Sequence, residues 1–208
     1  STNAKNVAKT SPVITQYKKA ELTFDSKITF FIKLFNSNYE KKHEDGTVKD
    51  HGSRQHASFA SPVYRNLAYK MIEKLAQHYG NDPRIIGWQL DNEPAVQHDY
   101  NLKAEQGYRE FLRKKYNNDI QALNKAWGTA FWSEVYSSFE EITLPKRSQW
   151  GMNHHQILDY RRFAASQTNE FLNNQCLIIK KYAKNQFAPA RTIVSSLVSP
   201  LRSTVIVT

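Results

Sequence analysis

The 208-residue chain has one cysteine, Cys176, and no long apolar run free of charge. A single cysteine can form neither an internal disulfide nor a cysteine-based metal cluster, so a disulfide scaffold is excluded. The longest apolar run near the N-terminus, ITFFIKLF at 28–35, is interrupted by Lys33 and is too short to span a bilayer. No small-residue cleavage site of a signal peptide follows it. We therefore expect no membrane partner and a cytoplasmic protein.

Acidic residues are also scarce, with 19 Asp and Glu against 29 Lys and Arg and a net charge of +10. A basic balance can indicate nucleic-acid binding, so a basic nucleic-acid-binding module is one alternative. The positive charges are scattered, however, with no block of five, and no RNA-binding or zinc-finger signature is present. We expect a solvated basic surface and no nucleic-acid partner. The apolar content of 40% is typical of a globular chain.

A helix followed by a buried strand is predicted over residues 61–90. Ser61 and Pro62 suit the N-cap and first position of a helix. Apolar residues then recur at three and four spacing up to Tyr79, and Gly80 suits the C-terminal end. After a turn, RIIGWQL at 84–90 has the length and composition of a buried strand. Its end carries the polar run DNEP at 91–94.

Later periodicities predict three more helices. Residues 105–116 place several aromatic and aliphatic side chains on one face, and Asp119 and Gly128 suit the ends of a short helix at 120–127. The stretch at 129–145 is aromatic and irregular, and a long helix is predicted from about 155 to 184 with Cys176 buried in it. Helices alternating with a buried strand that ends in polar groups favour an α/β fold with its site at the strand's carboxyl end.

The polar strand end has the chemistry of a proton-transfer site. Glu93 follows the predicted strand, so we expect it to be half desolvated, and desolvation raises a carboxyl pKa and makes the group a usable proton donor. Asn92 beside it offers both a donor and an acceptor to a sugar hydroxyl. Asp91 alternates to the other side of the strand and is expected to make a structural contact.

The segment IIGWQLDNEP resembles the acid/base strand of the retaining glycosidases built on (β/α)8 barrels. More closely, three stretches are similar to the β-galactosidases of glycoside hydrolase family forty-two: HGSRQHASFASPVYRNLAYKMIEKLAQHYGNDPRIIGWQLDNEP, KYNNDIQALNKAWGTAFWSEVYSSFEEITLP and LDYRRFAASQTNEFLN. The resemblance implies that residues 39–187 are part of a glycosidase catalytic domain, an α/β fold forming a partial (β/α)8 TIM barrel. Residues 1–38 stay unassigned, and residues 188–208 form a divergent tail without acidic residues, as a truncated or frame-shifted reading would produce.

The resemblance also implies a reaction and its residues. The reaction is hydrolysis of terminal β-D-galactosides with retention, with Glu93 as general acid/base. Asn92 matches the amide that contacts the sugar 2-hydroxyl, and Arg54, in HGSR, matches an arginine of the galactose-binding site. An arginine can give forked hydrogen bonds to neighbouring hydroxyls. No cofactor is required, and a homo-oligomer, a trimer in the family, is possible for a complete enzyme.

Two departures from the family bear on activity and metal binding. A retaining glycosidase needs a second carboxylate, the nucleophile, about 5 to 5.5 Å from the first. The family places it at the end of strand seven, and we expect it to be absent here, because none of the later candidates follows an apolar strand: Glu134, Glu140, Glu141 and Glu170. A non-catalytic sugar-binding or misfolded fragment is therefore the main alternative, and completion by another chain a further one.

The sequence does not predict a metal site. Some family members bind zinc through a cysteine cluster, and Ser58 stands where one of those cysteines is expected. His51 and His56 lie in a predicted loop, and the adjacent pair His154 and His155 has poor chelating geometry. We therefore expect no metal site.

Overall fold

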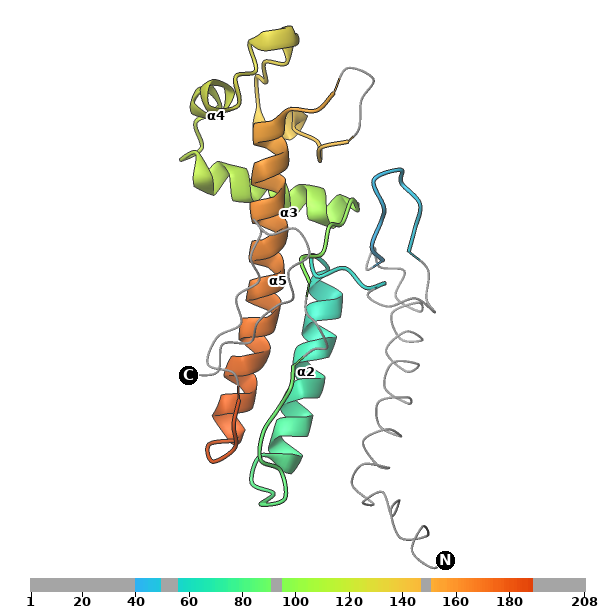
Figure 1. The fold of residues 1–208 in the computed structure, drawn as a ribbon, viewed down its shortest axis with the longest axis vertical. Helices are drawn as coiled ribbons and strands as arrows, with labels where there is room; N and C mark the ends of the chain where they lie inside the picture. The colour runs from blue at the N-terminus through green and yellow to red at the C-terminus, as the bar shows by residue number, and fades with distance from the viewer. Residues whose placement is uncertain (1–39, 50–55, 91–94, 147–150, 189–208) are drawn as a thin grey trace, which may run out of the picture. The chain divides into compact units, whose positions relative to one another are not determined.

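The computed structural model describes residues 40–49, 56–90, 95–146 and 151–188 (Figure 1). All of them belong to one unit of the chain, Asn38–Thr208. The elements in chain order are α2 (Pro62–Tyr79), α3 (Leu102–Lys115), α4 (Ile120–Trp127), the 3-10 turns η1 (Phe131–Ser133) and η2 (Phe139–Glu141), and α5 (His154–Tyr182). The unassigned N-terminal segment and the divergent tail, from residue 189, lie outside the described residues.

The predicted start and end of α2 are confirmed, although Gly80 is needed for a different reason than expected. The Ser61 hydroxyl accepts from the Tyr64 N–H at 3.4 Å, and Pro62 occupies the first position. Gly80 is the C-cap but has a right-handed φ of −64°. A Cβ on Gly80 would lie 2.4 Å from the Ala76 oxygen and 2.8 Å from the Tyr182 oxygen. Glycine therefore stands there because the end of α5 approaches the backbone closely.

The shorter helices follow their sequence signals. Asp119 accepts from the N–H groups of Gln121 and Ala122 at 2.8 and 3.1 Å, and Gly128 ends α4 with a left-handed φ of 65°. Helix α3 starts earlier than predicted because the Asn101 side chain caps it. Helix α5 begins one residue before and ends two residues before its predicted bounds, and irregular chain with two short 3-10 turns fills the predicted aromatic stretch.

Helices α2 and α5 lie side by side (Figure 1). Arg65 of α2 donates to Gln167 of α5, and near the other end the Tyr182 hydroxyl donates to Glu73 at 2.5 Å. Only Ala76 of α2 is fully buried, so the predicted apolar face of this helix is mostly half-exposed. Helix α5 and loop residues such as Phe59 and Leu90 cover part of that face.

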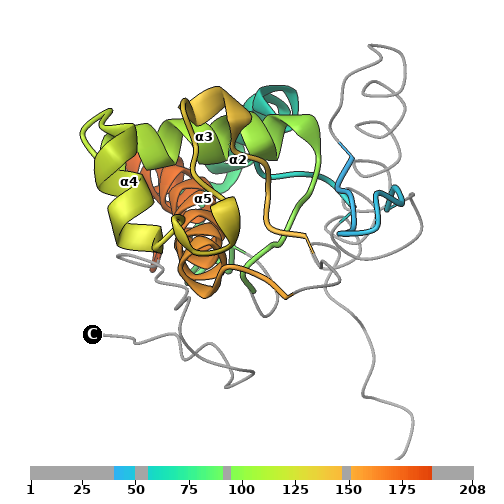
Figure 2. The same cartoon turned by 90° about the horizontal axis from the view of Figure 1, so that it is seen from above.

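The best-buried part of the described chain lies where α3 and α4 pack against the first half of α5 (Figure 2). Four side chains there are entirely buried: Tyr108, Leu112, Leu123 and Ile142. The Asp159 carboxylate of α5 accepts from the Tyr116 hydroxyl and the Trp127 indole N–H, and also from Lys115. One buried acid thus ties together the ends of three helices.

The prediction of a buried strand at 84–90 is wrong, because this segment makes one β-bridge and stays partly exposed. Gly87 and Phe187 form a parallel β-bridge, with the Trp88 N–H donating to the Phe187 oxygen at 2.9 Å and the Phe187 N–H to the Ile86 oxygen at 2.8 Å. No longer strand occurs in the described residues, and Ile86 is 89% exposed. A parallel strand is buried when strands on both sides and helices on both faces cover it, and one neighbour cannot do this.

Candidate functional site

The three residues that the sequence assigns to the site lie outside the described residues. Arg54 falls in the gap at 50–55, and Asn92 and Glu93 fall in the gap at 91–94. The structure does describe the chain that enters and leaves these segments. Those flanking residues show how the fold supports the candidate site.

The chain entering residue 91 is held by backbone and amide hydrogen bonds. The parallel bridge fixes Gly87, and the Trp88 indole N–H donates to the Gln186 side-chain oxygen at 2.6 Å. The Gln186 amide in turn donates to the backbone oxygens of Tyr79 and Asp82 at 2.7 and 3.0 Å. Gln186 therefore joins the end of α2 to the segment that leads into Glu93.

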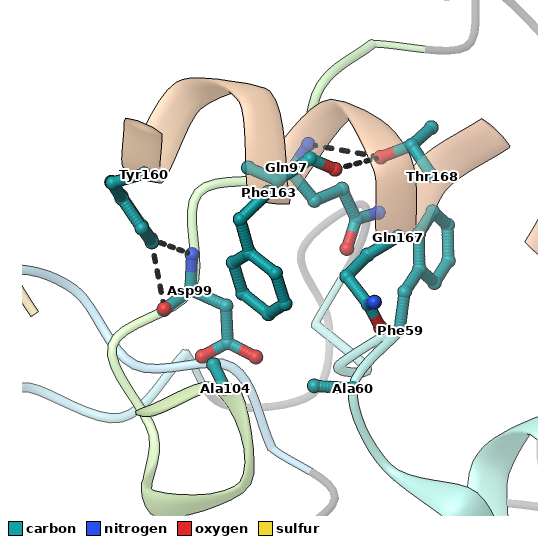
Figure 3. A pocket seen from close by; sticks show the side chains of 10 residues that line it. Phe59, Ala60, Gln97, Asp99, Ala104, Tyr160, Phe163, Gln167 and Thr168 are labelled. Atoms are coloured by element: carbon teal, nitrogen blue, oxygen red, sulfur yellow. Dashed lines mark hydrogen bonds between the residues drawn. The ribbon is translucent and has the colours of Figure 1, made fainter. Parts of the chain in front are cut away.

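The chain leaving residue 94 is held by α5. The Gln97 N–H donates to the Thr168 hydroxyl at 3.4 Å (Figure 3). The Tyr160 hydroxyl accepts from the Asp99 N–H and donates to the Asp99 backbone oxygen, both at 2.8 Å. Burial raises the pKa of Tyr160, so its hydroxyl keeps the proton that it donates. Two side chains of one helix thus fix residues 97–99.

The chain leaving the Arg54 segment is also fixed. The backbone oxygen of Phe59 accepts from the Arg65 guanidinium at 2.5 Å, and the Phe59 ring stacks on Phe171 of α5 with centroids 4.3 Å apart. Arg65 also pairs with Glu170 at 3.1 Å. The turn after Arg54 therefore rests on α2 and α5 together.

The flanks of the two candidate segments meet in one apolar cluster. Phe59, Phe171 and Leu172 form its buried centre, and Leu90 and Val96 pack against it. Phe59 lies five residues after Arg54, and Leu90 and Val96 each lie three residues from Glu93. The fold thus brings together the chain on either side of Glu93 and the chain that follows Arg54.

The hairpin at 40–49 is hydrogen-bonded to the chain that leaves residue 94, and we call residues 97–99 of that chain the exit segment. Its turn at Asp45–Gly46 has a left-handed φ of 86° at Gly46. The Asp99 Oδ1 atom accepts from the backbone N–H groups of Lys42 and Asn101, both at 3.0 Å. Next to this contact, burial and then the cationic Lys41 and Arg161 lower the pKa of His98, which favours its neutral form.

Sequence reasoning missed the supporting residues Asp99, Tyr160 and Thr168. Asp99 had a weak local signal, because Asp and Asn two positions apart before a helix are typical of turn and cap chemistry. Tyr160 and Thr168 had none, because their partners lie 61 and 71 residues away along the chain. Only the packing of α5 against the exit segment reveals them.

The residues present do not fit the zinc site of some family members. Ser58 is buried, and its hydroxyl accepts from the Ala60 N–H at 3.1 Å in a tight turn. Cys176 is buried in α5, as predicted, and far along the chain from Ser58. Within the ranges that the structure describes, no three His, Cys, Asp or Glu side chains gather as a metal would require. In the same ranges, no helix has the length and apolarity to cross a membrane.

The later acidic residues are used on the surface. Glu140 is exposed and pairs with Arg113, and Glu141 is exposed and accepts from the Ser137 N–H at 2.8 Å. Glu134 follows η1 and Glu170 lies within α5. None of these carboxylates follows a strand in the described part of the chain.

Comparison with known proteins gives a consistent family. A sequence model of glycoside hydrolase family forty-two, described as beta-galactosidase, matches residues 36–200. The beta-galactosidase of Thermus thermophilus is 39% identical over 147 residues, which cover 69% of this chain and 22% of the relative. Beta-galactosidase Pbg of Clostridium perfringens is 38% identical over 131 residues, covering 63% of this chain and 19% of the relative.

Solved structures agree with the sequence relatives. The beta-galactosidase of the haloarchaeon Halorubrum lacusprofundi superposes with a TM-score of 0.72 at 29% identity, covering 80% of this chain and 26% of that protein. That of the psychrophilic Marinomonas ef1 superposes with a TM-score of 0.71 at 34% identity, covering 76% and 24%. The chain therefore spans about a fifth to a quarter of the length of the proteins that it matches.

Proposed function

The chain belongs to the β-galactosidase family whose sequence model matches residues 36–200, and from this membership we propose that it forms part of a retaining β-galactosidase with Glu93 as general acid/base. The substrate would be a terminal β-D-galactoside. In the first step the nucleophilic carboxylate of the complete enzyme bonds to the sugar, the glycosidic bond breaks and Glu93 protonates the leaving oxygen. In the second step it takes a proton from the water that releases galactose.

The observation that carries this proposal is the fixed approach to residue 91, taken with the family match. The parallel bridge pairs Gly87 with Phe187, and Glu93 follows this paired segment in the sequence. In parallel α/β architectures, catalytic groups sit at this end of the strands. Asn92 would contact the sugar 2-hydroxyl beside Glu93, and Arg54 would bind the galactose.

The finer architecture is also part of the proposal. Helix α2 precedes the bridged segment around Gly87, and after the intervening α3 and α4, α5 precedes the bridged segment around Phe187; the two bridged segments are parallel. This order is that of helix–strand–helix–strand units of a partial (β/α)8 barrel. Because the chain spans about a fifth of its curated relatives, we place the nucleophile in a part of the complete domain that the described residues do not include. Trimer formation and a cytoplasmic location stay predictions.

The test uses a chimera in which residues 39–187 replace the matching part of the Thermus thermophilus relative. We expect the chimera to hydrolyse nitrophenyl β-galactoside and Glu93→Gln to lower kcat by about 10²- to 10⁴-fold, the usual contribution of a general acid/base. The loss in the first step should be larger for an alkyl galactoside than for a dinitrophenyl galactoside, because a good leaving group needs little protonation.

The matched control is Glu140→Gln, which removes an exposed carboxylate of the same type. It should leave kcat and the leaving-group dependence unchanged. Equal losses in both variants, or full activity in Glu93→Gln, would contradict the assignment of Glu93. The isolated 208-residue chain should show no turnover, and a rate that Glu93→Gln abolishes would place a nucleophile within this chain or its oligomer.

A second candidate, sugar binding without turnover, is favoured by the exposure of the bridged segment. Ile86 is 89% and Phe187 49% exposed, whereas strands of a complete barrel are covered on both faces. Titrating galactose into the isolated labelled chain, with amide shifts as the readout, tests it. Shifts that Arg54→Met abolishes would support binding by this chain alone, and no shifts would reject it.

A further inference from the structure

A small cavity lies where residues 97–99 cross helix α5 (Figure 3). Its volume is about 10 Å³, roughly the space that a single water molecule needs. Apolar side chains from three parts of the chain form much of its wall: Phe59, Ala104 and Phe163. Gln97 and Asp99 provide two of its polar walls.

Two oxygen atoms of this wall lack a hydrogen-bond donor. Residues Gln97 and Asp99 are 7% and 6% exposed, and neither Gln97 Oε1 nor Asp99 Oδ2 receives a hydrogen bond from the described residues. The other carboxylate oxygen, Asp99 Oδ1, already accepts from the backbone N–H groups of Lys42 and Asn101. Buried polar atoms in folded proteins nearly always have a partner, so these two acceptors require an explanation.

A single partner that serves both atoms has to be a donor with two protons or a cation, because a carbonyl oxygen and a carboxylate oxygen accept. A metal cation takes about six oxygen ligands, and the cavity offers two unpartnered oxygens. The negative charge of Asp99 also already interacts with Lys41. One water molecule fits the size of the cavity, and it can donate one proton to each of the two acceptor oxygens.

We propose that this cavity binds one resident water molecule, which donates to Gln97 Oε1 and to Asp99 Oδ2. The water completes the set of bonds that Thr168 and Tyr160 make to the same segment. It is therefore a positioning element of the chain that leaves residues 91–94. This inference stands whether or not Glu93 is the acid/base, because its tests do not measure turnover.

A crystal structure of the full chain tests the proposal directly. We expect a density peak within hydrogen-bond distance of Gln97 Oε1 and Asp99 Oδ2, without anomalous signal after a soak in rubidium chloride. An anomalous peak would identify a cation and overturn the proposal. An empty cavity, with the Gln97 amide turned to donate directly to Asp99, would overturn it as well.

Two variants distinguish a water molecule from a cation in the cavity, independently of the rubidium soak. Asp99→Asn replaces one acceptor by an N–H donor, and the water should remain because it can accept from that group, whereas a cation would leave. Gln97→Met removes an acceptor at similar side-chain length, and the peak should disappear. The matched control Gln121→Met, on the exposed side of α4, should leave the peak in place.

A solution measurement covers the case in which the chain does not crystallise. A resident water should give a magnetisation-transfer peak between water and the Gln97 side-chain protons, and the Asp99 amide should exchange slowly. Both should be lost in Gln97→Met and kept in Gln121→Met, while the urea midpoint shows that each variant is folded. Absence of the water peak in the folded unmodified chain would reject the site.

Discussion

Around the first half of α5, helices α3 and α4 bury Tyr108, Leu112 and Leu123 completely, whereas beyond its last turn the chain around Gly87 meets Phe187 through one parallel bridge. We call these the packed end (α3, α4, η2 and 154–172) and the bridge end (84–90 and 183–188). In the packed end, the side chains of Lys115 and Trp127 reach Asp159, which lies 44 and 32 residues further along the chain. The bridge end has the composition of a core strand but only one paired neighbour, so composition alone does not make a buried strand.

The largest expected difference between the two ends comes from truncating one aliphatic side chain in each. Leu112→Ala removes a fully buried side chain, and we expect a loss of about 3 kcal/mol in the free energy of unfolding. Ile86→Ala removes one that is 89% exposed, and we expect a change within about 0.5 kcal/mol. Urea unfolding of the two variants measures both values.

Equal losses of unfolding free energy in Leu112→Ala and Ile86→Ala would contradict this difference between the two ends. They would mean that Ile86 is covered in solution, for example by other parts of the chain or by a second copy. Sedimentation at several concentrations would then distinguish these two explanations, since only a second copy makes the effect depend on concentration.

Asp159 makes the stability of the packed end depend on pH. Burial alone would raise the pKa of Asp159, but hydrogen bonds from Lys115, Tyr116 and Trp127 outweigh it and hold the pKa below its usual range. A carboxyl whose pKa is lower in the folded state stabilises the fold above its unfolded pKa of about 3.9. That contribution is lost as the pH falls through the folded pKa.

We therefore expect Asp159→Asn to cost about 2 kcal/mol at pH 7, the range of a hydrogen bond to a charged group. The cost should shrink as the pH is lowered from 5 to 2. Urea titrations across this range check it, with Glu110→Gln, an exposed acid of the same packed end, as control. A cost that stays constant with pH would show that Asp159 acts through packing and not through charge.

Gly80 sharpens the comparison because it sits between α2 and the last turn of α5. Gly80→Ala must move the backbone at Ala76 or Tyr182, so we expect a loss of about 1.5 kcal/mol. In Gly107→Ala the new methyl group meets only the tip of the Phe163 ring, at 3.2 Å, inside α3. Alanine favours a helix interior over glycine by about 1 kcal/mol, so this variant should be neutral or more stable. Thermal unfolding of both variants measures the contrast.

The smallest expected effect is local to the bridge end. Gln186→Ala leaves the Trp88 indole N–H and the oxygens of Tyr79 and Asp82 without their amide partner. We expect hydrogen exchange at the amides of Trp88 and Phe187 to quicken about five- to tenfold, as for a local opening easier by about 1 kcal/mol. The urea midpoint should change little. A global loss as large as that of Leu112→Ala would show that both ends unfold as one unit.

The sequence predicts well whatever depends on neighbouring residues. Ser61, Asp119 and Gly128 mark helix ends by short-range hydrogen bonds or backbone conformation, and their predictions are confirmed. The prediction that residues 84–90 form a buried strand is wrong, because the burial of a strand depends on segments that are distant in sequence. The roles of Arg54, Asn92 and Glu93 rest on resemblance to the family and stay predictions, while the residues that support their flanks could be found only from the fold.

The pairing of α2 with α5 has a consequence for synthesis of the chain. Arg65 and Gln167 are 102 residues apart, and Glu73 and Tyr182 are 109 apart. At roughly 5 to 20 residues per second, a ribosome needs on the order of 5 to 20 s to make the stretch between them. During that time the apolar face of α2 has left the ribosome without its partner. The nascent chain is therefore most exposed to aggregation before α5 is made, and a chaperone that holds α2 would act in this interval.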